Sequence, residues 1–156
     1  MIALLLLACR ATPETTTCNP TAADGQMSAT IDAADWSGSA SFLWAGESLQ
    51  LNTENAGAGW ITMVAQGSST GNSVQIDADA QAFPITVSLV SSGGGFATYY
   101  PASGNSFSTN NAAGGSLSIS NLDESTAEGC FRFEAAGDDG TVTVEEGSFV
   151  AHLSMI

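Results

Sequence analysis

His152 is the only histidine in the chain, so catalysis by an imidazole base has one candidate. A serine hydrolase would bring this histidine together with a serine and an acid. In the stretch SFVAHL, however, His152 lies on the face of a strand opposite Phe149, Ala151 and Leu153. Serines are too numerous for one of them to stand out as a nucleophile. We therefore expect an exposed histidine, no catalytic residue, and a protein that is not an enzyme.

Two pairs of aspartates could provide carboxylate chemistry. Asp77 and Asp79 lie two residues apart on an expected strand, and Asp138 and Asp139 lie in an expected turn. Paired carboxylates serve glycosidases, and calcium takes about six to eight oxygen ligands. Neither pair has the spacing of a calcium-binding loop, so the four residues are weak metal candidates and a solvated acidic surface is favoured. We expect no bound metal and no cofactor.

Aromatic side chains are the remaining candidates for binding. Trp36, Trp44, Trp60, Tyr99 and Tyr100 could stack against sugars, although core packing competes for the same residues. Trp36 follows an expected turn, and one of the adjacent residues Tyr99 and Tyr100 must face outward if both lie on a strand. We therefore take Trp36, Tyr99 and Tyr100 as possible ligand-binding residues.

Composition limits the class of partner. The chain has 156 residues, sixteen Asp and Glu, two Arg, no Lys, and a net charge of −14. Such a surface repels phosphate, which excludes nucleic-acid binding through a basic patch. The length fits one domain that is large enough to bury a core.

The first residues predict how the chain is localised. The apolar run from Ile2 to Ala8 is too short to span a bilayer, which needs about 20 helical residues. Leu6-Leu7-Ala8-Cys9 resembles the lipobox of bacterial lipoproteins, whose signal is cut before the cysteine that becomes acylated. The resemblance implies a signal segment at 1–8, with its usual basic residues encoded upstream, and a lipidated Cys9. An N-terminal buried strand with a core cysteine is the alternative.

The next residues read as a polar spacer. Thr, Pro, Asn and Asp dominate 9–26, which we expect to be a flexible tether between the membrane and a domain at 27–156. If Cys9 is lipidated, Cys18 and Cys130 remain as a pair in an oxidising compartment. In GCFRFEA, Cys130 alternates with inward-facing phenylalanines and so points to solvent, where the tether could bond to it. Two free thiols are the alternative.

Alternation of apolar and polar residues predicts strands through the rest of the chain. The expected strands are 28–33, 41–45, 48–52, 60–66, 73–78, 84–90, 95–100, 116–122, 130–135, 141–145 and 148–153. Gly, Asn, Asp and Ser separate them. The fold class is therefore all-β, an antiparallel sandwich or barrel of about ten short strands with no significant helix.

The last third of the chain resembles a family of small bacterial lipoproteins built around a domain of unknown function. The matching positions are Gly115, Leu117, Ile119, Asp123, Gly129, Phe131, Phe133, Ala135, Val142, Val144, Gly147 and Phe149. The resemblance implies a β-sandwich lipoprotein at the cell envelope with no known activity. We expect a non-catalytic, monomeric protein with a structural or interaction role, anchored in the outer membrane; the alternative is a module that binds glycan or metal ions.

Overall fold

Alternating apolar and polar side chains produce ten strands in the computed structural model, which describes residues 17–45, 48–54, 57–66, 83–90, 92 and 94–154. The strands are β1 (Gln26–Ile31), β2 (Ala34–Ala45), β3 (Ser48–Glu54), β4 (Trp60–Gln66), β5 (Ile85–Ser88), β6 (Gly95–Tyr100), β7 (Phe107–Ser108), β8 (Gly114–Leu122), β9 (Thr126–Gly137) and β10 (Gly140–Leu153). In the described part of the chain, the only helical segment is the 3₁₀ turn η1 (Thr109–Asn111), and no helix is long and apolar enough to cross a membrane. The predicted all-β class is confirmed. The strand expected at 73–78 lies outside the described residues.

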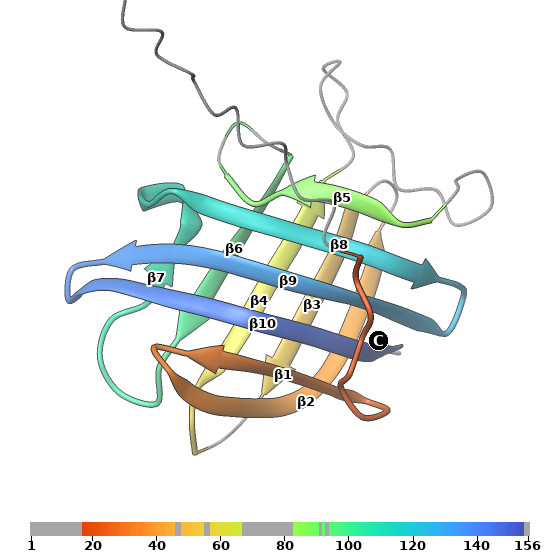
Figure 1. Cartoon of the computed structure of the whole chain (residues 1–156), viewed down its shortest axis with the longest axis horizontal. Helices are drawn as coiled ribbons and strands as arrows, with labels where there is room; N and C mark the ends of the chain where they lie inside the picture. Colours follow the sequence, from red (N-terminus) through yellow and green to blue (C-terminus); the bar gives the residue numbers. More distant parts are fainter. Residues whose placement is uncertain are drawn as a thin grey trace, which may run out of the picture.

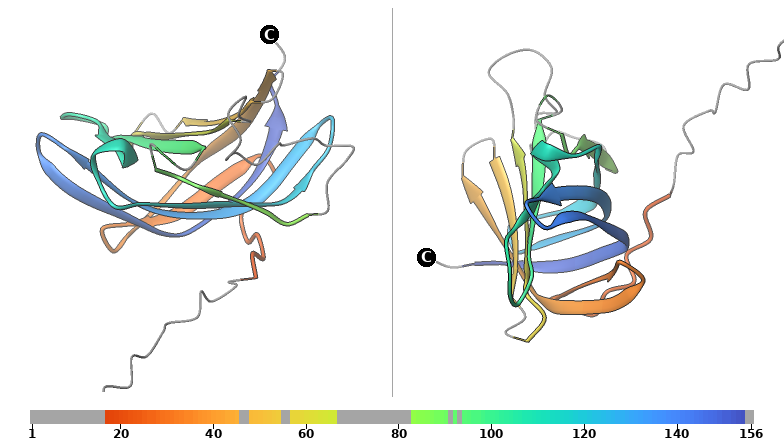
Figure 2. Two further views of the ribbon diagram at one scale, coloured as in Figure 1. Left: turned by 90° about the horizontal axis from the view of Figure 1, so that it is seen from above. Right: turned by 90° about the vertical axis from the view of Figure 1, so that its left-hand side faces the viewer.

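The strands form two layers that are hydrogen-bonded into one sheet, in the order β1-β10-β2-β3-β4-β6-β7-β9-β8-β5, with further pairings of β1 with β2 and of β10 with β9. In Figure 1, β5, β8, β9, β10 and β1 run across the near layer, and β3, β4 and β6 cross behind them at a steep angle. Figure 2 shows the two layers edge on. The arrangement is a sandwich whose two layers are joined because β10 pairs with both β2 and β9, while β5 lies at the end of the strand order. It has two outer faces for contact with other molecules.

Strand β2 joins the two layers. Its first half pairs with β1, from Ala34 opposite Ile31 to Ser39 opposite Gln26, and its second half pairs with β3. The expected strand began only at residue 41. The missed signal is the period-two pattern in which Trp36, Gly38, Ala40 and Phe42 are buried while the intervening residues are polar.

Strand β10 is one strand where two were expected. Its register against β9 shifts between Val144 and Gly147, and Glu146 there has a φ of 51°. This β-bulge lets the strand continue through residues that break the alternation, which is why the sequence pattern suggested two strands. A Cβ on Gly147 would lie 2.5 Å from Cδ2 of the Phe131 ring, so the bulge requires glycine at this position.

The core lies between the two layers. It is built from inward-facing residues of nearly every strand, and its largest fully buried members include Phe42, Phe149, Met27, Leu49, Leu51, Ile61, Met63, Leu117, Ile119 and Val144. The predicted inward face of β9 is confirmed, since Phe131, Phe133 and Ala135 are all buried. Polar residues between them therefore point away from the core, onto the outer face of the near layer.

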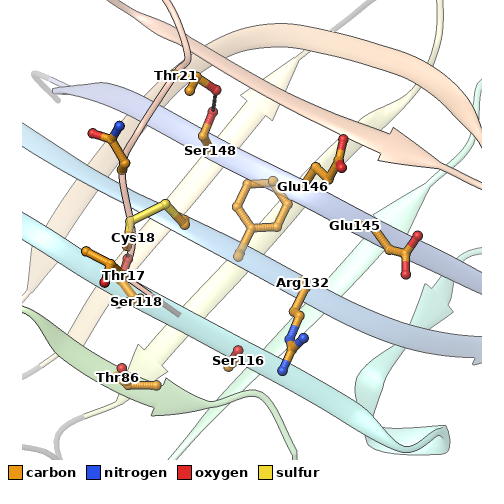
Figure 3. A pocket seen from close by; sticks show the side chains of 14 residues that line it. Thr17, Cys18, Thr21, Thr86, Ser116, Ser118, Arg132, Glu145, Glu146 and Ser148 are labelled. Atoms are coloured by element: carbon orange, nitrogen blue, oxygen red, sulfur yellow. Dashed lines mark hydrogen bonds between the residues drawn. A yellow bond between two sulfur atoms is a disulfide. The ribbon is translucent and has the colours of Figure 1, made fainter. Parts of the chain in front are cut away.

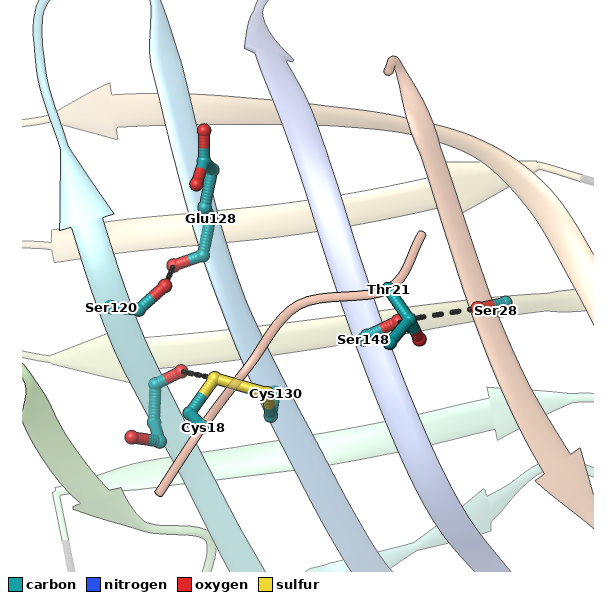
Figure 4. Close-up of a disulfide and its surroundings, with 8 residues drawn as sticks. Cys18, Thr21, Ser28, Ser120, Glu128, Cys130 and Ser148 are labelled. Carbon is teal, nitrogen blue, oxygen red and sulfur yellow. Dashed lines mark hydrogen bonds between the residues drawn. A yellow bond between two sulfur atoms is a disulfide. The ribbon is translucent and has the colours of Figure 1, made fainter. Parts of the chain in front are cut away.

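Residues 17–25, which we expected to be part of a flexible tether, lie across this outer face. Cys18 forms a disulfide with Cys130 of β9, with the Cα atoms 5.6 Å apart, as Figure 4 shows. Farther along the segment, the Thr21 hydroxyl lies 3.2 Å from that of Ser148 on β10. The described part of the expected tether is thus attached to the domain, and the proposed pairing of Cys18 with Cys130 is present.

Candidate functional site

Trp36, one of the three predicted ligand-binding residues, is a core residue instead. Its side chain is only 6% exposed, and its indole Nε1 donates a hydrogen bond to the carbonyl oxygen of Ala58 at 3.2 Å. The sequence reading was wrong because β2 begins before Trp36 and turns this side chain toward the core. Trp36 therefore cannot form a platform for a ligand.

Tyr99 and Tyr100 occupy opposite faces of β6, as the alternation predicted. Tyr99 packs against the core, stacks on Phe107 with ring centroids 6.3 Å apart, and donates its hydroxyl to Ala58 at 3.4 Å. Burial, and then the negative charge of Asp32, raise the pKa of Tyr99 above its ordinary value of 10.0. Only Tyr100 contributes to the outer face of the far layer.

The exposed aromatic site consists of Trp60 and Tyr100. These residues are opposite one another on β4 and β6, and their rings stack with centroids 4.9 Å apart and planes inclined by 17°. Trp60 is 44% exposed, although it is the kind of side chain that normally provides buried area. Its exposure could have been read from the sequence, because Ile61, Met63 and Ala65 alternate with it and face the core.

A shallow groove of about 400 Å³ adjoins Trp60 on this face. Its walls come from β2, β3 and β4, and its lining residues are Ser39, Ser41, Asn52, Thr53, Glu54, Trp60 and Thr62. The amide of Asn52 is oriented by its neighbours, since its Oδ1 accepts hydrogen bonds from Gln50 at 3.0 Å and from Thr62 at 3.5 Å. We call Trp60, Tyr100 and this groove the aromatic face. It offers a ring surface beside hydroxyl, amide and carboxylate groups.

A second groove, of about 890 Å³, lies on the outer face of the near layer. One wall is the segment that Cys18 attaches to β9, the floor is formed by β8 and β9, and the opposite end is the bulge of β10. Figure 3 shows its polar lining: Thr17, Cys18, Thr21, Thr86, Ser116, Ser118, Arg132, Glu145, Glu146 and Ser148. We call this the arginine groove. No sequence motif links these residues, so the groove could not be predicted from the sequence.

Hydroxyl groups at one end of the arginine groove are bonded to each other. The Ser148 hydroxyl, 3% exposed, lies 3.2 Å from that of Thr21 and 3.3 Å from that of Ser28 on β1 (Figure 4). The Sγ atom of Cys18 lies 3.9 Å from the carbonyl oxygen of Ser118. These contacts hold the wall of the groove in place before any ligand arrives.

His152 is half exposed, as expected, and its Nε2 lies 2.9 Å from a carboxylate oxygen of Asp24. The two residues join the end of β10 to the segment before β1. No hydrogen bond between His152 and a serine hydroxyl is found in the described part of the chain. The imidazole therefore has the geometry of a surface ion pair when protonated.

Of the candidate carboxylates, Asp138 and Asp139 lie among the described residues. Asp138 and Asp139 are exposed in the β9–β10 turn, and Asp139 accepts hydrogen bonds of 3.2 Å from the backbone and side-chain nitrogens of Asn105. Asp77, Asp79 and Cys9 lie outside the described residues. Among the residues that the structure describes, no three His, Cys, Asp or Glu side chains gather where they could hold a metal ion.

The sandwich corresponds to one sequence family. A model of a domain of unknown function, DUF6252, matches residues 26–151, from the first residue of β1 to the third-last residue of β10. No curated protein and no solved structure matches the chain significantly. The match confirms that the C-terminal pattern belongs to a domain of unknown function and extends it to the whole sandwich. The chain therefore belongs to the DUF6252 family.

Proposed function

We propose that this protein is a non-catalytic, lipid-anchored protein of the bacterial cell envelope with an interaction role. The Cys18–Cys130 disulfide carries the proposal, because such bonds persist in exported proteins and are rare where the cytosol keeps thiols reduced. The apolar run that ends at Cys9 supports it from the sequence. An acylated Cys9 inserted in the outer membrane would hold the attached segment and the sandwich next to the bilayer.

Intact mass spectrometry tests the anchor. The protein is expressed with its full leader, and membrane and soluble fractions are measured with and without reductant and alkylation. The expected product is membrane-bound, cut before Cys9, carries the mass of a diacylglycerol, and takes up two alkyl groups only after reduction. A Cys9→Ser variant should be soluble and uncleaved. A wild-type chain that is soluble, uncleaved and unlipidated would contradict the proposal.

Carbohydrate is the ligand class that the aromatic face favours. Sugar rings carry apolar C–H faces that stack on aromatic rings, and their hydroxyls need hydrogen-bonding partners at the rim. Trp60 and Tyr100 supply the ring surface, while Asn52, Glu54 and Thr62 supply donors and acceptors beside it. The single observation behind this candidate function is the exposure of Trp60 next to a polar groove.

Glycan binding is tested with the purified protein against N-acetylglucosamine, glucose and mannose oligosaccharides, by calorimetry and by tryptophan fluorescence. Trp60→Ala should abolish binding without unfolding the domain, because the side chain is outside the core. Leu153→Ala is the matched control, since Leu153 is 41% exposed but does not line the groove. Equal binding by Trp60→Ala and wild type, or no binding to any of these glycans, would exclude the glycan role and leave the anchor untouched.

A further inference from the structure

The arginine groove has a cation that is unusual for this protein. Arg132 is the only Lys or Arg among the described residues of a chain with a net charge of −14. It forms no ion pair with any described carboxylate, although Glu145 and Glu146 line the same groove. In a chain this acidic, an exposed guanidinium is expected to form an ion pair with a neighbouring carboxylate. Because Arg132 does not, the five N–H donors of its guanidinium are available to a ligand.

The position of Arg132 suits an oxyanion. Arg132 lies opposite Ser116 of β8 in the register, and in Figure 3 its side chain extends over that strand beside the Ser116 hydroxyl. Thr86 and Ser118 add hydroxyls from the next positions on β5 and β8. A guanidinium fork flanked by hydroxyls matches the geometry of a carboxylate or a phosphate group.

The β10 side of the groove, next to Arg132, has the opposite charge, because Val144 and Gly147 on either side of the bulge pair with Phe133 and Phe131 on either side of Arg132. Glu145 and Glu146 both project from the β10 bulge, and the positive φ of Glu146 is part of the backbone geometry that exposes the two carboxylates together. These carboxylates, together with the net charge of the chain, repel a ligand that carries only negative charge. They would bind an ammonium group at the same time as Arg132 binds an anion.

From this charge pattern we infer that the arginine groove binds a small zwitterionic ligand of the amino-acid or short-peptide class. The ligand's carboxylate contacts Arg132 and the hydroxyls of Ser116 and Thr86, and its ammonium group contacts Glu145 and Glu146. The groove volume of about 890 Å³ is ample for a short peptide. The disulfide that fixes the wall reduces the ordering needed on binding. This site is separate from the aromatic face, which lies on the other layer.

Nitrogen NMR of arginine side chains provides a direct probe. The chain has only two arginines, Arg10 and Arg132, so the Nε–H spectrum contains few signals to assign. Glycine, diglycine and triglycine, which carry the same two charges at increasing separation, are titrated into the full-length protein. We expect saturable shifts of the Arg132 signal with at least one of them. Triglycine with an acetylated N-terminus and triglycine with an amidated C-terminus should each bind about tenfold or more weakly than free triglycine.

Variants separate the two halves of the site. Calorimetry follows binding to the variants, because Arg132→Gln removes the NMR signal itself. Arg132→Gln should abolish binding, and Glu145→Gln with Glu146→Gln should remove the preference for a free amino group while the carboxylate still binds. Leu153→Ala, at an exposed residue that does not line the groove, is the control that should bind normally. The inference is overturned if the Arg132 signal does not move, if acetylated and free peptides bind equally, or if only phosphoethanolamine binds, which would indicate a lipid headgroup. Each of these results is independent of whether glycans bind the aromatic face.

Discussion

Trp36 and Tyr99 donate hydrogen bonds to the same carbonyl oxygen, that of Ala58, from β2 and β6 on either side of the β3–β4 connection. The two aromatic residues thus link the far layer to the loop that precedes β4. The exposed Trp60 begins β4, two residues after Ala58. The buried aromatic residues therefore position the exposed one.

Removal of the two hydrogen bonds to Ala58 should lower the free energy of unfolding by unequal amounts. Tyr99→Phe loses one long bond from a partly exposed hydroxyl and should lower the free energy of unfolding by about 0.5–1.5 kcal/mol. Trp36→Phe loses a bond and leaves space in the core, and should lower it by about 2–4 kcal/mol. Urea denaturation of both variants measures the difference. Equal effects of the two substitutions would contradict the core position of Trp36.

Tyr99 also predicts how stability changes at high pH. Its pKa is raised above 10.0 in the folded protein, first by burial and second by Asp32, so the unfolded chain loses this proton at lower pH than the folded one. Stability from this group is therefore complete below pH 10 and is lost as the pH rises above that value. With two tyrosines in the chain, phenolate absorbance can follow the titration, and the difference between wild type and Tyr99→Phe should isolate the Tyr99 component. A Tyr99 midpoint at or below 10 would contradict this assignment.

The disulfide should contribute strongly to stability. Cys18 and Cys130 are separated by 112 residues, and a bridge that closes a loop of this size is worth about 2–5 kcal/mol, mainly through the unfolded state. Replacement of both cysteines by alanine should lower the free energy of unfolding by this amount. Reduced wild type is the control and should match the double variant. Equal stability of oxidised and reduced protein would show that the bridge does not constrain the chain.

The turn between β1 and β2 offers a stabilising substitution. Asp32 and Ala33 have φ values of 47° and 67°, a conformation that suits glycine better than alanine at the second position. Ala33→Gly should raise the free energy of unfolding by about 0.5–1 kcal/mol, the balance of relieved strain and lost chain entropy. Ala34→Gly, one residue farther and already in β2, should lower it. Thermal denaturation of the two variants tests the sign of each change.

Asp123 should titrate at unusually low pH. Its Oδ1 accepts hydrogen bonds from the backbone nitrogen and hydroxyl of Ser125, at 2.7 and 2.9 Å, and from the backbone nitrogen of Thr126 at 2.8 Å. The backbone bond from Ser125 is the largest cause of a pKa below 3.8. The stability of this β8–β9 turn is present above the ordinary pKa and is lost as the pH falls through the lowered one. Carboxyl NMR should show this midpoint, and Ser125→Ala should move it upward.

Strands β6 and β9 show how much of the fold the alternation of apolar and polar residues predicts. The period of two correctly assigned Tyr99 and Tyr100 to opposite faces and turned Cys130 outward, where a segment of the same chain could reach it. It failed at the β10 bulge, where the strand extends past a local break in the pattern because pairing with its neighbours compensates for that break. At Trp36 the alternation is intact, and the error was to start the strand too late.

By itself, the sequence determined the strand-rich fold class, the alternating faces of most strands, the acidic character of the surface and the even pair of cysteines, since these depend on residue type and local period. Only the tertiary structure decided that Arg132, the β10 bulge and the Cys18 segment border one groove. These relationships join residues more than a hundred positions apart. They depend on strand register and on how two layers pack, which no local pattern specifies.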